Sequence, residues 1–183
     1  MNQLIFITFF VFLFSIKGSP QTSYITREGT ISFYSSAPLE DITAVNNKVQ
    51  SMLNLDTGEI IVRLRIEDFR FRIALMQKHF NERFMESHIY PESRFTGIID
   101  GIVTFPHEYF PDEVTVKGSL TIHGVTREVE TTGRIQRSGP NLICNATFPV
   151  RVADYDIKIP RILIRNIAEV VEVTVDMTME PVN

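Results

Sequence analysis

The sequence is poor in the residues that support several common kinds of function. It contains one cysteine and no tryptophan among 183 residues. A single cysteine excludes an internal disulfide framework and a multi-cysteine metal site. Lys and Arg number 18 against 22 Asp and Glu, so there is no basic excess to neutralise phosphates, and nucleic acid is not an expected partner. With 44% hydrophobic and 22% charged residues, the chain has the composition of one globular domain.

Motifs of catalysis are also missing. The sequence has no Gly-x-Ser-x-Gly elbow, no Gly-rich phosphate loop and no His-Glu-x-x-His, which are the common signatures of hydrolases, nucleotide-binding proteins and zinc proteases. Cys144 is predicted on the inward face of a strand, so we interpret it as a small buried hydrophobe rather than a nucleophile. Asp154-Tyr155-Asp156 is the one compact polar group, and its two acids are expected on one solvated strand face. We predict that the protein is not an enzyme.

The N-terminus carries the one long hydrophobic run. Residues 4–16 (LIFITFFVFLFSI) contain no charge, but a membrane-spanning helix needs about 20 apolar residues. Gly18-Ser19-Pro20 follows, as is typical of a secretory signal peptide. We expect residues 1–19 to be a signal peptide and residues 20–183 to form a periplasmic or secreted domain with no stable membrane span after cleavage. An uncleaved anchor is the alternative.

The rest of the chain alternates between apolar and polar residues with a period of two, which is typical of half-buried antiparallel strands. The pattern is clearest over 171–180, 114–122, 125–135 and 142–150, with His123-Gly124 as a tight turn. Strands over 43–55 and 60–66 flank a turn at residues 56–59. Residues 23–36 are predicted as two short strands broken at Glu28-Gly29.

Two features interrupt this pattern. The apolar face changes from even to odd positions across Glu67-Asp68, which predicts a bulge or bend. Apolar residues at 73, 76, 80 and 84 have helical spacing, so residues 73–85 are predicted to form a helix. A strand is then predicted over 95–105 with bends at Gly97 and Gly101, followed by a loop over 106–111.

Eight to ten strands, one helix and no alternation of strands with helices indicate a closed antiparallel barrel or a sandwich. The long hairpins favour the barrel. The predicted fold is therefore all-β: an extended antiparallel lipocalin-like β-barrel of about eight strands, with one short α-helix in a long connection. The inward Phe and Met residues, which include Met52 and Met179, suit a ligand cavity and a solid core equally well.

Two charged groups could bind a ligand. His79, Glu82 and Glu86, with His88 nearby, could hold a divalent ion from one helical face. A solvated face paired with neighbouring basic residues is the favoured interpretation, and no metal is predicted. The second group could meet an anionic head group, although a solvated outer face is again favoured. Its members are Arg63, Arg65, Arg70, Arg72 and Arg94.

Three stretches of the sequence carry a resemblance to a known family. They are LMQKHFNERFMESHIYPESRFTG (75–97), VKGSLTIHGVTREVE (116–130), and FPVRVADYDIKIPR (148–161) with IAEVVEVTVDM (167–177). In order and spacing the sequence resembles the YceI-like family of secreted, lipocalin-like polyisoprenoid-binding proteins.

The resemblance implies an extended barrel around a long apolar tunnel. It further implies a non-catalytic carrier that holds an isoprenoid, either a quinone or a polyprenyl lipid, as its partner, with no cofactor besides that lipid and no protein partner specified. The alternative is a stress-related or protein-interaction module with a solid or structurally lipid-filled barrel and an apolar surface patch around Phe105, Tyr109 and Phe110.

The candidate ligand-binding residues are inferred from inward alternation. They are Phe33, Leu64, Phe69, Phe71, Met76, Phe80, Phe84, Phe95, Leu120, Ile122, Phe148, Val173, Val175 and Met177.

Overall fold

The computed structural model describes residues 22–104, 109–160 and 167–182, so the expected signal peptide lies outside the described residues. The strands are β1 (Ser23–Ser36), β2 (Asp41–Asn54), β3 (Glu59–Arg65), β4 (Arg70–Phe71), β5 (Glu92–Ile99), β6 (Val114–Ile122), β7 (Val125–Ser138), β8 (Asn141–Arg151) and β9 (Val170–Pro181). The helical elements are α1 (Ala74–His79), the π-helix η2 (Phe80–Phe84), and the 3-10 helices η1 (Ile66–Asp68), η3 (Ile102–Thr104) and η4 (Val152–Tyr155).

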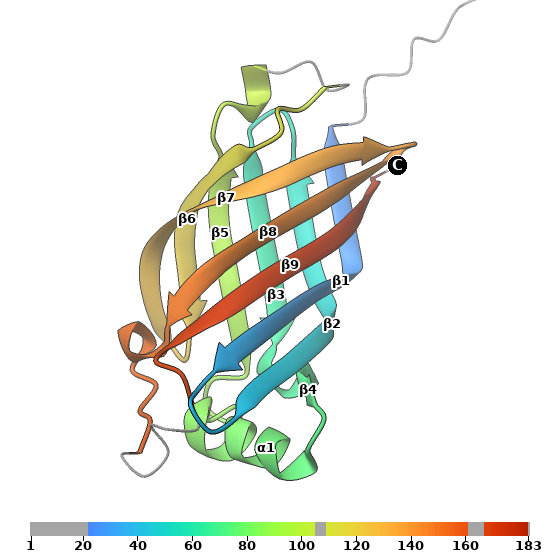
Figure 1. Ribbon diagram of the computed structural model, residues 1–183. Coiled ribbons are helices and arrows are strands. Elements are labelled where there is room, and N and C mark those ends of the chain that lie inside the picture. The colour runs from blue at the N-terminus through green and yellow to red at the C-terminus, as the bar shows by residue number, and fades with distance from the viewer. Residues whose placement is uncertain (1–21, 105–108, 161–166, 183) are drawn as a thin grey trace, which may run out of the picture.

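The strands close into a barrel. Their order is β1-β9-β8-β7-β6-β5-β3-β2-β4, and β1 also pairs with β2. Eight strands therefore complete the antiparallel ring, while the two-residue β4 pairs with β2 (Figure 1). This confirms the predicted antiparallel barrel with a short helix, and it excludes the sandwich. Among the described residues, no helix has both the length and the apolar character needed to cross a membrane.

The predicted hairpin turns are present, and their backbone explains their sequences. His123 and Gly124 have φ of 51° and 75°, and Gly58 has φ of 75°. Two successive residues with positive φ match the turn type that suits the twist of a two-residue hairpin. The 123–124 turn therefore sets the register of β6 against β7, in which Ile122 faces Val125.

Strand β1 corrects one prediction. Residues 23–36 form a single strand, and its pairing with β2 shifts on both sides of Gly29. The expected break is therefore a bulge. On β2 the buried positions change from Ala44 and Asn46 to Val49 and Leu53 across this irregularity. Met52, predicted to face inward, consequently points outward and is 48% exposed.

The predicted bend at Glu67-Asp68 is the 3-10 helix η1. Buried Asn46 holds it in place, because its Nδ2 donates to the Arg65 carbonyl oxygen at 2.9 Å. The same side chain accepts the Lys48 backbone N–H at 2.9 Å. A bent segment would otherwise leave these backbone groups unpaired in the wall.

Strand β5 ends earlier than predicted. It stops at Ile99, Gly101 has φ of 70°, and residues 102–104 are helical; Phe105 lies outside the described residues. The predicted bend at Gly97 is wrong, because β5 continues through it. A Cβ on Gly97 would lie 2.3 Å from the Lys117 carbonyl oxygen and 2.5 Å from Cζ of Phe95. Glycine is required there by the close approach of the neighbouring strand and the Phe95 ring.

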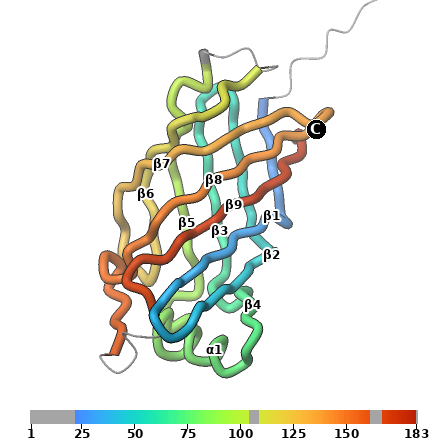
Figure 2. Tube along the Cα trace, in the orientation of Figure 1, coloured from blue at the N-terminus to red at the C-terminus, as the bar shows by residue number. Residues whose placement is uncertain are grey.

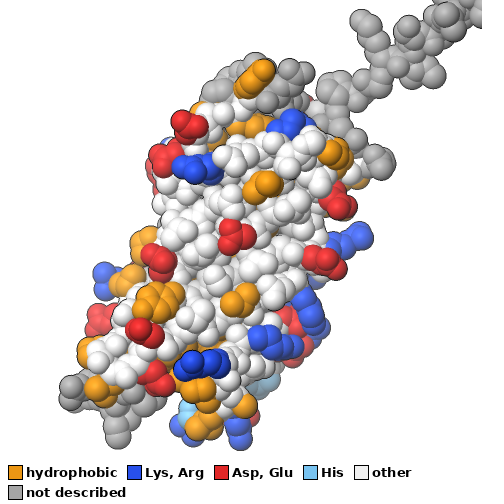
Figure 3. Space-filling model, turned by 45° about the vertical axis from the view of Figure 1, so that its right-hand side comes forward, with side chains coloured by type: hydrophobic (Ala, Val, Ile, Leu, Met, Phe, Trp, Pro, Cys, Tyr) orange, Lys and Arg blue, Asp and Glu red, His pale blue; other side chains and the backbone are white. Residues whose placement is uncertain are grey.

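The two ends of the barrel differ. The packed end, at the β2–β3 and β7–β8 turns, is filled by side chains that are at most 2% exposed: Tyr24, Leu53, Leu55, Ile102, Leu142 and Met179. The opposite end, which we call the helix end, is covered by α1 (Figure 1). The face of the molecule in Figure 3 carries scattered charges of both signs and small separate hydrophobic areas.

Candidate ligand cavity

A cavity of about 680 Å³ occupies the barrel toward the helix end. Inward side chains of the strands and one side of the α1–η2 segment line it. All fourteen candidate residues from the sequence lie on its wall. Several of them, such as Phe95 and Phe148, are only half-buried although they point into the barrel. Their role as ligand contacts stays a prediction.

The cavity is closed toward the packed end. Its deepest lining includes Ile60, Ile99, Ile135, Cys144 and Met177. The residues of the packed end lie beyond this layer and do not line the cavity. The space is therefore a blind pocket rather than the tunnel that the resemblance implied.

Aromatic rings pack together at the helix end. Phe80 of η2 packs against Phe33, Phe69 and Phe71, with ring centroids 5.0–5.9 Å apart among the four. Offset and edge-on ring contacts of this kind contribute about 0.5–1.5 kcal/mol each beyond the area they bury. The helical segment is thus held by the same side chains that form the wall of the cavity.

A polar contact ties the helical segment to the far side of the barrel. Glu86 follows η2, and its Oε2 lies 3.0 Å from Nε2 of His123 in the β6–β7 turn. Nδ1 of His123 lies 3.2 Å from the carbonyl oxygen of Tyr155 in η4. Both ring nitrogens of His123 therefore contact oxygen atoms of neighbouring segments. Tyr90 packs edge-on against the ring with centroids 4.4 Å apart. We call Glu86, Tyr90, His123 and Tyr155 the His123 latch.

The titratable groups near the cavity show the effect of burial. Desolvation raises the pKa of the Cys144 thiol to about 12, so it stays protonated and unreactive at neutral pH. Its Sγ contacts Sδ of Met179 at 3.8 Å. The predicted inward position of Cys144 is confirmed. Burial also raises the pKa of Tyr155, with the charge of Asp154 adding to the effect.

The Asp154-Tyr155-Asp156 group is not on a strand as predicted. Residues 152–155 form η4, and Asp156 has φ of 55°. Tyr155 is buried, whereas Asp154 and Asp156 are exposed. The two acids therefore do not converge into the cavity as a pair.

The possible metal-binding group on the helix does not form either. The π-helix widens the turn over residues 80–84, so the spacing of His79, Glu82 and Glu86 no longer places them in one row. Glu86 pairs with His123 instead. Within the described part of the chain, no three His, Cys, Asp or Glu residues gather closely enough to hold a metal ion.

The five arginines lie exposed, as the favoured interpretation predicted. Arg63 pairs with Glu92 at 3.4 Å, Arg65 with Glu67, and Arg70 with Asp68 at 3.9 Å. Of the five, Arg94 lines the cavity.

Sequence reasoning missed part of the wall. Val62, Val116, Val129 and Val171 line the cavity, and the alternation of β3, β6, β7 and β9 could have identified them. Ile157, in the segment after η4, also lines it. No local pattern signals Ile157, because its position depends on how the segment folds back over the barrel.

The fold and the site together define an eight-stranded antiparallel barrel with a blind apolar cavity, an arrangement typical of proteins that enclose one small apolar ligand. The sequence matches the YceI-like domain family over residues 19–179. The chain belongs to this family.

Solved structures share the fold. A polyisoprenoid-binding domain from Saccharophagus degradans, implicated in plant cell wall breakdown, superposes with a TM-score of 0.74 at 16% identity, covering 88% of this chain and 99% of that one. BcnA from Burkholderia cenocepacia gives 0.70 at 14% identity, covering 82% and 95%. The YCEI protein of Campylobacter jejuni gives 0.54 at 10% identity, covering 97% of both chains. No curated protein sequence matches this chain.

Proposed function

We propose that this protein is a non-catalytic carrier that holds the hydrocarbon chain of an isoprenoid, a quinone or a polyprenyl lipid, in the barrel. The observation that carries the proposal is the 680 Å³ cavity with its apolar wall, a size within the roughly 300–1,000 Å³ of ligand pockets. The polyisoprenoid-binding domain from Saccharophagus degradans, which shares the fold, supports the same ligand class.

The wall suits a flexible chain. An isoprenoid chain gains about 25 cal/mol for each Å² of apolar surface removed from water. The loss of its conformational freedom opposes binding, so the wall must fit closely. Phe rings and unbranched Met side chains, such as Met76 and Met177, adapt their shape to an irregular ligand. The expected signal peptide would place such a carrier in the periplasm or outside the cell.

Mass spectrometry tests the proposal directly. The protein is secreted by its own host, purified without detergent, and extracted with organic solvent. An isoprenoid at close to one molecule per chain is the expected result. Protein that contains none, and that also takes up neither added quinones nor added polyprenols, would contradict the carrier function.

A substitution in the wall tests where the chain lies. Ile122 is half-buried and lines the cavity, so Ile122→Trp should fill the space and weaken quinone binding by about tenfold or more, a loss of roughly 1.4 kcal/mol. Met52→Trp is the matched control, because Met52 points outward. Equal binding by both variants would show that the ligand does not occupy this part of the barrel.

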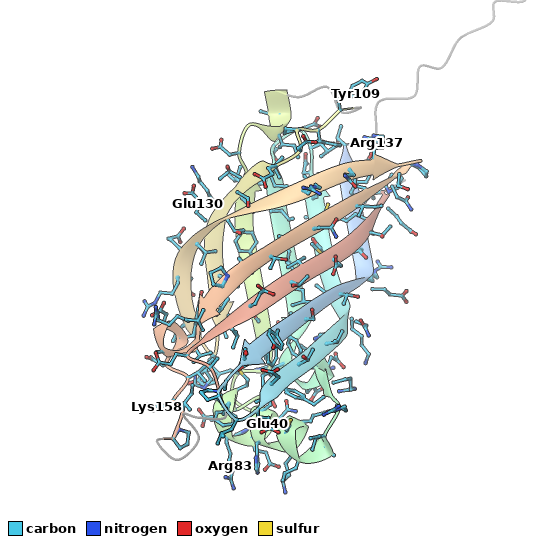
Figure 4. All side chains as sticks on the ribbon, in the orientation of Figure 1. Glu40, Arg83, Tyr109, Glu130, Arg137 and Lys158 are labelled. Atoms are coloured by element: carbon cyan, nitrogen blue, oxygen red, sulfur yellow. The ribbon has the colours of Figure 1, made fainter. Side chains whose placement is uncertain are left out.

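One observation favours the second candidate, a protein-interaction module. Tyr109 is 74% exposed beside half-buried Phe110, at the packed end of the barrel (Figure 4). This reading predicts no saturable lipid binding and the loss of a partner protein in Tyr109→Ser.

A further inference from the structure

The barrel wall is incomplete between β7 and β8. The two strands pair from Ser138 and Asn141 as far as Gly133 and Ala146, and no further. Beyond this point β7 pairs only with β6, through residues 125–132, and β8 pairs only with β9, through residues 147–151. The two traces diverge there (Figure 2). We call the gap between β7 125–132 and β8 147–151 the side opening.

The side opening is continuous with the cavity. In a closed wall only alternate residues of a strand line the interior. Here the longest unbroken runs of lining residues fall on the two unpaired segments, and they include outward-facing positions. They are Arg127, Glu128, Val129, Glu130 and Thr131 of β7, and Phe148, Pro149, Val150 and Arg151 of β8. The cavity therefore reaches the outer surface between the strands, where Glu130 projects from β7 (Figure 4).

The sequence keeps the side opening from closing. Pro149 lies on the free edge of β8 and lacks a backbone N–H, so β8 cannot form a complete ladder there. At the other strand, Arg127 puts a charge at the edge, which disfavours pairing with a further strand. Glu128 and Glu130 contact Ser119 and Lys117 of β6. Gly133, paired with the small Ala146 where the strands part, lets β7 bend away.

Both limits of the side opening are fixed by contacts. At one limit stands the Gly133–Ala146 pair. At the other, η4 bridges the gap, since Nε of Arg127 donates to the carbonyl oxygen of Asp154 at 3.0 Å. The His123 latch holds the same helix through Tyr155. The opening is thus a bordered gap in the wall rather than a frayed strand end.

We propose that the lipid passes sideways between β7 and β8, and that its polar end stays at the rim of the side opening while its chain lies in the cavity. This inference rests on the proposed carrier function and specifies its route. The interior behind the rim is apolar, with Val129, Phe148 and Val150, whereas Glu128, Glu130 and Arg151 offer polar groups at the surface. The packed end blocks the route from the opposite end of the barrel.

A bulky adduct at the rim tests the route. Glu130→Cys is coupled to a polyethylene glycol maleimide, and Gln136→Cys is the control, because it is an exposed position on the same face of β7 beside the paired part of β8. Cys144 is buried with a pKa of about 12, so the maleimide reacts only at the introduced thiol. The probe is a farnesyl amine that carries a dansyl group at its polar end.

The adduct at residue 130 should slow both association and dissociation of the probe by about fivefold or more, whereas the adduct at 136 leaves both rates unchanged. The dissociation constant should change little, because an obstructed route affects both rates alike. Equal rates for the two adducts would overturn the side route. If the unmodified protein does not bind the probe at all, the carrier function itself fails.

Discussion

The two ends of the barrel are built from the same kinds of residue, but one end is solidly packed and the other encloses a cavity. At the packed end, Leu53, Leu142 and Met179 are wholly buried against one another. Toward the helix end, Phe95, Phe148 and Val173 point inward from the same sheet and leave a cavity between them. The difference indicates that the packed end supplies the stability that permits the helix end to stay hollow.

The strongest test of this difference makes the same change, leucine to alanine, once in each region. Leu53→Ala, at 0% exposure, should lower the free energy of unfolding by about 2–5 kcal/mol. Leu120→Ala, at 8% exposure on the cavity wall, should cost clearly less, because its side chain already borders empty space. Urea denaturation measures both. Equal losses would show that the two ends do not differ in this way.

The wall of the hollow region should still be sensitive where its strands approach closely. A Cβ on Gly118 would lie 2.3 Å from the Thr96 carbonyl oxygen and 2.4 Å from Cα of Gly97. Gly118→Ala should therefore separate β5 from β6 and cost about 1–3 kcal/mol of stability. Ser119→Ala on the same strand is the control for thermal unfolding. Identical melting temperatures would contradict the predicted clash.

The His123 latch should contribute to the helix end alone. A double-mutant cycle of Glu86→Ala and His123→Ala should give a coupling of about 1 kcal/mol in urea unfolding. Hydrogen exchange should show faster opening of residues 74–85 in both single variants, with unchanged protection of β8 near Leu142. Uniform loss of protection across the barrel would mean that the latch supports the whole fold instead.

The smallest expected effect depends on pH. A hydrogen bond from Lys48, at 2.9 Å, is the main cause that holds the pKa of Asp68 below its usual value of 3.8. A lowered folded-state pKa stabilises the protein above that usual value, and the contribution is lost as the pH falls through the folded-state pKa. Because the pair lies near the surface, the effect should be below about 1 kcal/mol.

Asp68→Asn removes this contribution. As the pH is lowered from 5, the urea midpoint of the Asp68→Asn variant should therefore fall slightly less than that of the parent protein. A steeper fall in the variant would reverse the assigned sign.

Alternation in the sequence predicted the barrel and the lining, because a period of two fixes which side chains face inward. It did not locate the boundary between packed and hollow regions. Leu142 and Phe148 share one face of β8 and look alike in the sequence, yet only Phe148 borders the cavity. What separates them is the set of side chains across the barrel, which no local pattern records.

Irregular positions in the fold account for the features that the sequence predictions got wrong or missed. The bulge at Gly29 moved Met52 to the outside, and a shift of one residue reverses every face beyond it. The His123 latch joins residues 37 positions apart, and the side opening follows from pairings that are absent beyond Gly133. Such features depend on tertiary contacts rather than on propensity.

The packed end also limits the length of chain that the barrel can enclose. Because the floor at Cys144 and Met177 is fixed, a chain whose polar end sits at the surface has a set depth to fill. A shorter chain leaves part of the wall without contacts, and a longer one must leave carbon atoms in water. In the proposed carrier, the depth of the cavity would therefore select ligands by the length of their chain.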